Sequence, residues 1–520
     1  MAPGRKVWHH RSMSSPCAPP PPALIQALLG NDRHRLGTSE VTLVETHISW
    51  VLLAGEFAYK IKKPLKLPFL DFSTLALRKQ CCDDELRLNQ RFARDIYLDV
   101  VAITGTARNP RLGGTGVAIE YAVRMRRFDE SRRMDRICAR GDLTAAHLSD
   151  LADTLVAFHG AAAVAPEDSR FGSPEHILAP ALDNFHDLLQ QIPDAGVSQR
   201  LDHLRNWTLA EHRRLALRMQ NRKSAGLVRE CHGDLHLANM VLVDDHVRLF
   251  DCLEFNEDLR WLDTANEIAF TYVDLLDHGQ AGLASWFVDE VLSRNGDYEA
   301  VPLLRFYAVY RALVRAKVAA IRQGQNHGME QKNAVLVCIA QAERLIAPVP
   351  KRLIITHGLA GCGKTVASSH WLQGDTHART LRVRSDVERK RLFGLARSER
   401  SGSDTDAGIY TPDAHVLTYR RLAELATTIL QAGWSVVVDA AFLKRAERDA
   451  FHALATRLDA TFTILAPQAD TATLRRRILA RQATGKDSSE ATLKVLERQL
   501  QWIEPLHADE VVLQQESALN

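Results

Sequence analysis

The chain has 520 residues, which is enough for roughly three domains at about 150 residues each. Hydrophobic residues make up 46% and charged residues 25%, values that exclude wholesale disorder, a collagen-like or coiled-coil rod and a small disulfide scaffold. The net charge of +3 gives no global reason to expect DNA or an acidic membrane as a partner. The 8 cysteines are too sparse for a disulfide framework, and none forms a C-x-x-C pair, which argues against structural zinc and favours a reducing cytoplasm.

Residues 1–22 predict a disordered tail, because they contain a polyproline run and carry positive charge without the apolar segment of a signal peptide. Either Met1 or Met13 can be the start. Arginine and lysine interrupt the most apolar long stretch, at 306–321, so no run is long enough to cross a bilayer. We therefore expect a cytoplasmic protein with no membrane part.

Residues 23–128 predict a small β-rich lobe. Strand-like alternation runs through 41–63, with a hairpin expected at 54–56. A helical pattern follows, and a second hairpin is expected around 111–116, joining two further β-rich runs.

Residues 129–347 predict a larger lobe that is mostly helical, apart from a strand-like island at 227–255. Two prolines mark a linker at 348–352. Strands then alternate with helices over 353–515, which indicates a parallel sheet with right-handed crossovers.

The clearest motif is the run GLAGCGKT at 358–365, which fits G-x-x-x-x-G-K-[ST] between an apolar strand and a helix. Its glycines let backbone N–H groups turn toward phosphate oxygens, and the helix adds its positive end. The motif predicts an ATP–Mg²⁺ site, although a glycine-rich turn without a ligand is the alternative. The predicted site residues are the backbone cradle of Gly358, Gly361, Cys362 and Gly363, the phosphate-binding Lys364, and the metal ligand Thr365.

Two carboxylates end strands in the same unit. Asp439 follows the apolar run VVV and is placed either to hold the metal or to cap the next helix. Asp386 ends another strand, where it can deprotonate an acceptor hydroxyl or, alternatively, cap the helix that follows. Arg477 and Arg481 lie one turn apart on a predicted helix, as either a clamp on the phosphates or a solvated basic face.

Over residues 351 to about 510, these features resemble the small P-loop kinases of the zeta-toxin, polynucleotide-kinase and gluconate-kinase group. The resemblance implies ATP-dependent phosphorylation, with Asp386 as the base and Arg477 and Arg481 as lid arginines. Acceptors differ widely within that group, so the resemblance implies no particular substrate.

A second motif, CHGDLHLAN at 231–239, resembles the catalytic loop of aminoglycoside phosphotransferases, H-G-D-x-x-x-x-N. The resemblance implies that Asp234 accepts the proton of a hydroxyl group, and that Asn239 and Asp251 bind Mg²⁺. Asp263 matches the later aspartate that supports the catalytic loop in this family.

The same resemblance implies a phosphate-binding lysine and a partner glutamate in the small lobe. Lys60 matches best, Lys62 on the same strand face is the alternative, and Glu85 on the next helix is the expected partner. No glycine-rich loop precedes Lys60, and the D-F-G triplet reads Asp251-Cys252-Leu253. Aminoglycoside phosphotransferases share both departures, so the fold is retained while the substrate preference stays open.

The expected fold is an α+β bilobal protein-kinase-like domain followed by an α/β P-loop domain with a parallel sheet. The chain as a whole resembles predicted bifunctional aminoglycoside-phosphotransferase/ATP-binding proteins, which implies a tandem kinase acting on small hydroxyl compounds such as sugars or nucleosides. One alternative is a polynucleotide 5′-hydroxyl kinase, disfavoured because few aromatic residues interleave with the basic ones. Another is an ATP-sensing regulator with a pseudokinase first half, against which the intact set Asp234, Asn239 and Asp251 argues. The sequence does not indicate an oligomeric state.

Overall fold

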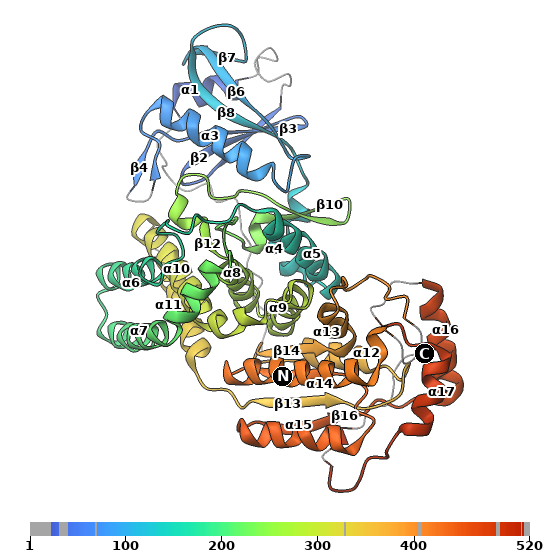
Figure 1. Cartoon of the computed structure of the whole chain (residues 1–520). Helices are drawn as coiled ribbons and strands as arrows, with labels where there is room; N and C mark the ends of the chain where they lie inside the picture. Colours follow the sequence, from blue (N-terminus) through green and yellow to red (C-terminus); the bar gives the residue numbers. More distant parts are fainter. Residues whose placement is uncertain are drawn as a thin grey trace, which may run out of the picture. The chain divides into compact units, whose positions relative to one another are not determined.

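The computed structural model describes residues 22–30, 40–67, 70–326, 329–403, 408–484, 489–510 and 512–513. Apart from its last residue, the predicted tail lies outside the described residues. The chain divides into two compact units. Figure 1 shows the helices and strands of the chain, coloured from the N-terminus to the C-terminus. The first unit comprises the residues up to Ile177 together with Arg218–Thr271, and the second comprises Leu178–Leu217 together with the residues from Tyr272 onward. Within the described segments, no helix is long and apolar enough to span a membrane.

A six-stranded antiparallel sheet begins the first unit. In spatial order its strands are β1 (Val41–Glu45), β2 (Ser49–Ala54), β3 (Phe57–Lys62), β8 (Ala118–Arg126), β6 (Tyr97–Thr106) and β7 (Asn109–Leu112). The expected hairpin at 54–56 is the turn between β2 and β3, where Gly55 has a φ of 57°. The run 41–63 holds three strands rather than two, because a further turn separates β1 from β2.

The two runs joined by the second expected hairpin do pair antiparallel, as β6 and β8, but the connection between them holds a further strand, β7. The chain turns at 107–108 between β6 and β7, and β8 pairs with the other side of β6. Pro110 lies in β7, at the edge of the sheet, where a residue without an N–H group is tolerated. In the sequence, this proline and the glycines after it read as one turn.

Two helices pack against this sheet. Apolar side chains of α1 (Ala23–Leu29), namely Ile25 and Leu28, join a buried cluster with strand residues. The longer helix α3 (Leu75–Asn89) lies against β6 and β8, and the Thr74 side chain caps its start by accepting a hydrogen bond from the N–H of Leu77. A short pair, β4 (Lys66–Leu67) and β5 (Leu70–Asp71), precedes this helix.

In the rest of the first unit, strands of the island predicted at 227–255 take part in two antiparallel strand pairs. One pairs β9 (Val228–Glu230) with β12 (Trp261–Asp263), and the other pairs β10 (Met240–Val243) with β11 (His246–Leu249). The short helices η1 (Glu130–Arg132), η2 (Leu237–Asn239) and η3 (Glu257–Leu259) and the helices α4 (Met134–Arg140) and α5 (Ala145–Ala161) complete this part. The H-G-D motif therefore lies between β9 and η2, and Asp251 follows β11.

Helices contribute the first part of the second unit. They are α9 (Ala281–Asn295), η4 (Tyr298–Ala300), α10 (Val301–Asn326) and α11 (Met329–Ile346), with parts of α6 (Pro174–Gln191), α7 (Ala195–Ser224) and α8 (Thr264–Asp277). The long helices α10 and α11 pack against each other, in agreement with the helical pattern of the sequence.

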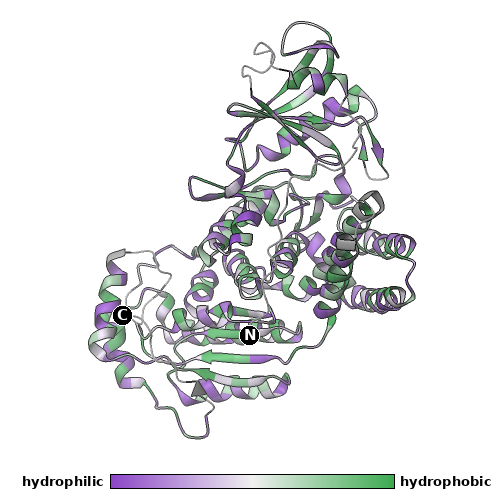
Figure 2. Cartoon of the chain, turned by 180° about the vertical axis from the view of Figure 1, so that it is seen from behind, coloured by the Kyte–Doolittle hydropathy of each residue, from purple (hydrophilic) through white to green (hydrophobic). Residues whose placement is uncertain are grey.

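A five-stranded parallel sheet forms the centre of the second unit. Its strands, in spatial order, are β14 (Thr380–Arg384), β15 (Ser435–Asp439), β13 (Arg352–Thr356), β16 (Thr461–Leu465) and β17 (Val512–Leu513). The central strands β13 and β15 are mainly hydrophobic, as Figure 2 shows for β13 and as a sheet covered on both faces requires. The elements that alternate with them are α12 (Lys364–Gln373), α13 (Ser385–Leu392), η5 (Gly408–Tyr410), α14 (Pro412–Gln431), α15 (Arg445–Arg457), α16 (Thr471–Thr484) and α17 (Leu493–Trp502). The expected fold class is confirmed.

Side chains of α9 cover the outer edge of β14. The backbone N–H of Thr380 donates to Ser285 Oγ at 3.4 Å, and that of Arg382 donates to Asp289 Oδ1 at 2.6 Å. The Arg382 guanidinium also lies 3.3 Å from Asp289 Oδ2. The compact units thus group α9–α11 with the P-loop sheet, and the domain boundaries expected from the sequence, including the linker at 348–352, stay a prediction.

Candidate active sites

The lysine and glutamate expected in the small lobe lie together in the first unit. Lys60 Nζ on β3 is 2.8 Å from Glu85 Oε1 on α3, and Lys62 Nζ contacts the other carboxylate oxygen of Glu85 and also Glu254. Burial would lower the pKa of Lys60, but the carboxylates of Asp251 and Glu85 raise it well above its ordinary value. Lys62 has no exposed surface, so Lys60 is the lysine of this pair that reaches a partly open carboxylate.

That carboxylate belongs to Asp251, which follows β11 with a φ of 63°. The backbone N–H of Asp251 donates to Tyr97 Oη at 3.0 Å, and its side chain, 44% exposed, pairs with Lys60. Partial burial would raise the pKa of Asp251, but Lys60 outweighs this effect and lowers it. The group is therefore an ionised oxygen ligand beside open space, of the kind that Mg²⁺ binds.

The catalytic-loop motif brings Asp234 and Asn239 into contact. Asn239 Nδ2 donates to the backbone carbonyl of Asp234 at 3.0 Å and to its Oδ2 at 3.1 Å. The ring of His236 lies 3.3 Å from the same carboxylate oxygen. Asp234 is partly exposed, so it can meet an acceptor from solvent.

A buried glutamate that sequence reasoning missed supports this loop. Glu267 on α8 accepts hydrogen bonds from the backbone N–H groups of His232, at 2.6 Å, and Gly233, at 2.9 Å, and it contacts the His159 ring at 2.6 Å. Burial would raise the pKa of Glu267, but His159 and these backbone groups lower it to about 2. Asp263, which was expected to support the catalytic loop, instead accepts two hydrogen bonds from the Arg222 guanidinium, both at 2.8 Å. The sequence signal that could have pointed to Glu267 is its position as an acidic residue one helical turn after Asp263.

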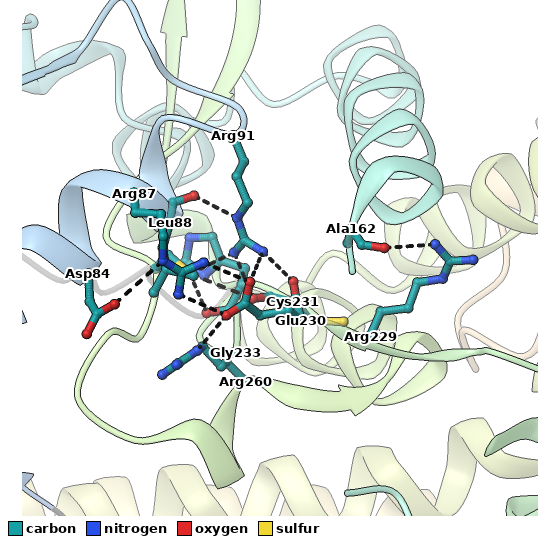
Figure 3. Close-up of polar contacts among 12 residues, drawn as sticks. Asp84, Arg87, Leu88, Arg91, Ala162, Arg229, Glu230, Cys231, Gly233 and Arg260 are labelled. Carbon is teal, nitrogen blue, oxygen red and sulfur yellow. Dashed lines mark hydrogen bonds and ion pairs between the residues drawn. The ribbon is translucent and has the colours of Figure 1, made fainter. Parts of the chain in front are cut away.

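Sequence reasoning also missed a cluster of three arginines around one carboxylate, here called the Glu230 cluster (Figure 3). Arg87 and Arg91, from α3 and the residues just after it, lie 3.1 and 3.2 Å from the carboxylate of Glu230, and Arg260 lies 3.2 Å from it. Arg91 also donates to the backbone carbonyls of Glu230, at 2.6 Å, and Cys231, at 3.2 Å. The cluster fastens the helix that carries Glu85 to the strand that enters the catalytic loop.

The P-loop of the second unit has the backbone shape that its glycines predict. Gly358, Gly361 and Gly363 have φ values of 143°, 84° and 100°, and α12 begins at Lys364. Lys364 Nζ donates to the carbonyl oxygens of Gly358 and Leu359, both at 2.9 Å. The Cys362 side chain is buried against α16, so only its backbone can meet a phosphate group.

The two carboxylates of this unit have different surroundings. Asp439 is buried at the end of β15, with the hydroxyl groups of Ser368 and Thr356 at 3.4 and 3.5 Å. Asp386 lies in the first turn of α13, 21% exposed, and pairs with Arg384 at 2.7 Å. Burial would raise the pKa of Asp386, but the Arg384 guanidinium outweighs this effect and lowers it.

One cavity of about 880 Å³ gathers nearly all the site residues expected in this half. Arg477 lines it and donates to the carbonyl of Gly361 at 3.4 Å, and Arg481 lines it and donates to the carbonyl of Ala491 at 3.0 Å. The remaining expected residues that line it are Gly361, Gly363, Lys364, Thr365, Asp386 and Asp439, whereas Gly358 and Cys362 do not. Arg389 also lines it, as do Tyr410, His415 and Tyr419, which were not expected from the sequence.

Comparison with known proteins gives a family match for the P-loop region and distant relatives for most of the chain. Residues 353–506 match the family described as an AAA domain. Uncharacterized proteins of Mycobacterium tuberculosis and Mycobacterium bovis are each 27% identical over 467 residues, which cover 88% of this chain and 90% of the relative.

Solved structures with similarity to the chain include a choline/ethanolamine kinase family protein from Mesorhizobium loti, 14% identical, which covers 62% of this chain and 95% of its own, with a TM-score of 0.39. A thermostable mutant of an aminoglycoside phosphotransferase is 13% identical over 60% of this chain and 97% of its own, with a TM-score of 0.37. A putative kinase from Chloroflexus aurantiacus is 25% identical over 32% of this chain and 85% of its own, with a TM-score of 0.26. In the chain itself, the N-terminal sheet and helices follow the kinase-like order expected from the catalytic-loop motif, and the match at 353–506 agrees with the P-loop domain.

Proposed function

We propose that this chain is a tandem ATP-dependent phosphotransferase that phosphorylates hydroxyl groups of small molecules at two separate sites. The observation that carries the proposal is the cavity of the second unit. A lysine, two carboxylates and two arginines line it together, namely Lys364, Asp386, Asp439, Arg477 and Arg481. That combination serves phosphoryl transfer, which depends on positioning and on neutralising phosphate charge.

The residues of this cavity fit ATP and Mg²⁺. Lys364 satisfies its ammonium group with carbonyl oxygens of its own loop, contacts that phosphate oxygens can replace. Thr365 and the buried carboxylate of Asp439 would hold Mg²⁺, since both offer the oxygen ligands that this ion prefers. ATP supplies the γ-phosphoryl group, and Arg477 and Arg481 neutralise the charge that develops on it.

Asp386 is the proposed base. It accepts the proton of the acceptor hydroxyl while the hydroxyl oxygen forms its bond to the γ-phosphorus and the bond from that phosphorus to the β,γ-bridging oxygen breaks, so that ADP leaves. Because Arg384 keeps the pKa of Asp386 below its ordinary value against the opposing effect of burial, the carboxylate is ionised and able to accept a proton at neutral pH.

The first unit supports the same chemistry with other residues. Lys60 would hold phosphate oxygens, Asn239 and Asp251 would hold Mg²⁺, and Asp234 would accept the hydroxyl proton. The contacts that favour these roles are those of Lys60 with Asp251 and of Asn239 with Asp234.

The test uses the full chain with one site silenced at a time, by Lys364→Ala or by Asp234→Asn. Each protein is incubated with ATP labelled on its γ-phosphate and a filtered small-molecule extract of a bacterial culture. We expect wild type to form products that divide into a Lys364-dependent set and an Asp234-dependent set. Lys79→Ala, at an exposed lysine of α3, is the matched control and should retain both sets.

Two outcomes would contradict the proposal. Label that appears only on a 5′-hydroxyl oligonucleotide, tested in parallel, would support the polynucleotide-kinase alternative. ATP binding without transfer to any acceptor would support the regulatory alternative. Isothermal titration gives an independent check, because Lys364→Ala should reduce the ATP bound per chain from two molecules to one.

A further inference from the structure

A second lysine, which the proposed chemistry does not use, holds the loop that carries the proposed metal ligand Asp251. Residues 251–254 are here called the metal loop. Lys62 lies two residues after Lys60 on β3, on the same face of the strand. Its ammonium group contacts the carboxylate of Glu254, the last residue of the metal loop. This ion pair therefore ties the six-stranded sheet to the metal loop.

The Lys62–Glu254 pair is closed to solvent. The side chain of Lys62 has no exposed surface, and that of Glu254 is 3% exposed. Burial would lower the pKa of Lys62, but the carboxylates of Glu254 and Glu85 outweigh this effect and raise it above its ordinary value. Lys62 therefore stays charged at neutral pH, while a phosphate group or Mg²⁺ that enters the site has no direct access to this pair.

The neighbouring pair of Lys60 and Asp251 differs, because both of its members are proposed to bind the ligand. ATP–Mg²⁺ would draw Lys60 toward phosphate oxygens and Asp251 toward the metal, so the contact between them would be given up in the complex. The backbone N–H groups of Cys252 and Leu253 donate hydrogen bonds that hold the middle of the metal loop. The buried pair is then the ion pair that still fastens the loop to the sheet when the ligand is bound.

Stability alone is a weak reason for such a pair. Replacing a buried ion pair by apolar residues of similar volume is often neutral or stabilising, because the charges regain the water that burial removed. A role in orienting a metal ligand is a stronger reason, since partners behind the ligands of a metal typically change its affinity by about 10–100-fold.

We propose that Lys62 is a positioning residue for Mg²⁺. Through Glu254 it fixes the metal loop, and with it the carboxylate of Asp251, in the position that binds Mg²⁺–ATP. This inference rests on the proposed function of the first unit. It gives the two lysines of β3 separate tasks: Lys60 holds phosphate oxygens, and Lys62 holds the loop that holds the metal.

The first experiment measures nucleotide binding at the first site alone. Every protein is a full chain that carries Lys364→Ala, and the chain with this change only is the parent. Isothermal titration gives the ATP affinity with Mg²⁺ and again with EDTA, and the ratio of the two affinities is the gain due to the metal. We expect Lys62→Met/Glu254→Met to reduce this gain by about 10–100-fold. Its ATP affinity in EDTA and its Tm should stay near those of the parent.

Two further variants make the comparison specific. Lys60→Met should weaken ATP binding in EDTA as well as with Mg²⁺, because this lysine is proposed to hold phosphate oxygens. Lys63→Met/Glu45→Met is the matched control. It removes an ion pair of 2.6 Å at the next residue of the chain, where the Glu45 side chain is 50% exposed, and it should change neither affinity.

The second experiment needs no nucleotide or metal. Hydrogen exchange, read by mass spectrometry on peptides that cover the metal loop, should be faster in Lys62→Met/Glu254→Met than in the parent, because the loop has lost its ion pair. The control Lys63→Met/Glu45→Met should exchange at the rate of the parent. Faster exchange in this loop at an unchanged Tm identifies a local effect on position.

A Lys62→Met/Glu254→Met chain that keeps the full gain due to the metal, or the exchange rate of the parent, would overturn this inference and leave the proposed function intact. So would a chain whose ATP affinity falls equally with Mg²⁺ and with EDTA, since that would show a general structural role. If this chain does not fold, Glu254→Gln, which keeps the shape of the side chain, is judged by the same ratio. If the parent binds no ATP, the proposed function of the first site fails, and the inference fails with it.

Discussion

The two carboxylates of the P-loop cavity differ in the groups that they contact, and this difference is the basis of the roles that we propose for them. Asp439 is buried among hydroxyl groups at a strand end, whereas Asp386 is partly exposed and paired with an arginine. A carboxylate beside Mg²⁺ stays ionised and is a poor proton acceptor, whereas one facing the acceptor is free to take the proton.

We therefore expect Asp386→Asn to lower turnover of the P-loop site by about 10²–10⁴-fold with ATP affinity retained. Asp439→Asn should instead weaken Mg²⁺-dependent ATP binding. Single-turnover phosphoryl transfer and nucleotide titration of both variants measure the two effects. Full turnover in Asp386→Asn would leave this residue without a role in proton transfer.

The Arg384–Asp386 pair predicts a pH effect at the same site. In wild type the lowered pKa of Asp386 keeps the carboxylate ionised down to acidic pH, so it should impose no acid limb on kcat/KM near neutrality. Arg384→Gln removes the positive charge that lowers the pKa of Asp386. Burial should then raise this pKa, because burial disfavours the charged form of a carboxyl group. The acid limb of the pH profile should then move to higher pH. An unchanged profile, in a variant that still folds, would mean that a different group accepts the proton.

At the scale of elements, the Glu230 cluster joins α3 to the entry of the catalytic loop. Glu230→Gln keeps the shape of the side chain but leaves Arg91 and Arg260 without their carboxylate. Breaking a buried ion pair at one partner costs roughly 3–5 kcal/mol, so we expect the free energy of unfolding to fall by that order in urea denaturation.

Glu257→Gln is the matched control, because this glutamate is exposed and contacts only Arg260 of the same cluster. It should change the free energy of unfolding by less than about 0.5 kcal/mol. Burial would raise the pKa of Glu230, but the arginines outweigh it and lower this pKa. The stabilisation should therefore be present at neutral pH and be lost as the pH falls below the ordinary glutamate range. Equal effects of the two variants would contradict the structural role of the cluster.

The elements also show what could be predicted from the sequence. Motifs with a fixed local spacing, such as the P-loop at 358–365 and the catalytic loop at 231–239, predicted the two candidate sites, because the backbone between their residues determines the geometry. The alternation of apolar strands with helices predicted the parallel sheet. Turns inside β-rich runs were harder, since Pro110 is tolerated at the edge of a sheet and reads as a break in a sequence.

Contacts between residues far apart in the sequence could not be predicted. Arg87 and Glu230 are separated by 143 positions, and Arg382 and Asp289 by 93. No local periodicity encodes such partners, because they depend on how the elements pack.

At the scale of the whole molecule, we predict that the parts of the chain before and after the expected linker at 348–352 do not behave as independent domains. Within the second unit, Arg379 donates to the carbonyl oxygens of Leu345 and Ala347 at the end of α11, at 2.6 and 2.9 Å, and Arg382 pairs with Asp289 of α9. Both arginines are buried, so separation would cost Arg382 its Asp289 carboxylate and Arg379 the carbonyl oxygens at the end of α11.

A protease site inserted between Pro348 and Pro350, which are exposed, tests this prediction in the full chain. After complete cleavage, the piece that begins at residue 351 should elute together with the rest on size-exclusion chromatography. Asp289→Ala should weaken the association, while Asp202→Ala, a change outside these contacts, should not. Clean separation of the cleaved wild-type protein would show that the P-loop domain is autonomous.

The hydrogen bonds from β14 to α9 have a consequence for solubility. Ser285 and Asp289 accept hydrogen bonds from amides on the outer side of a terminal strand of the sheet. Without them, that side would offer unpaired N–H and C=O groups as a template on which another extended chain can add. A piece that keeps the sheet but lacks α9 would therefore be prone to aggregation by strand addition while its nucleotide site is still folded. We therefore expect α9 to protect the open edge of the sheet against self-assembly.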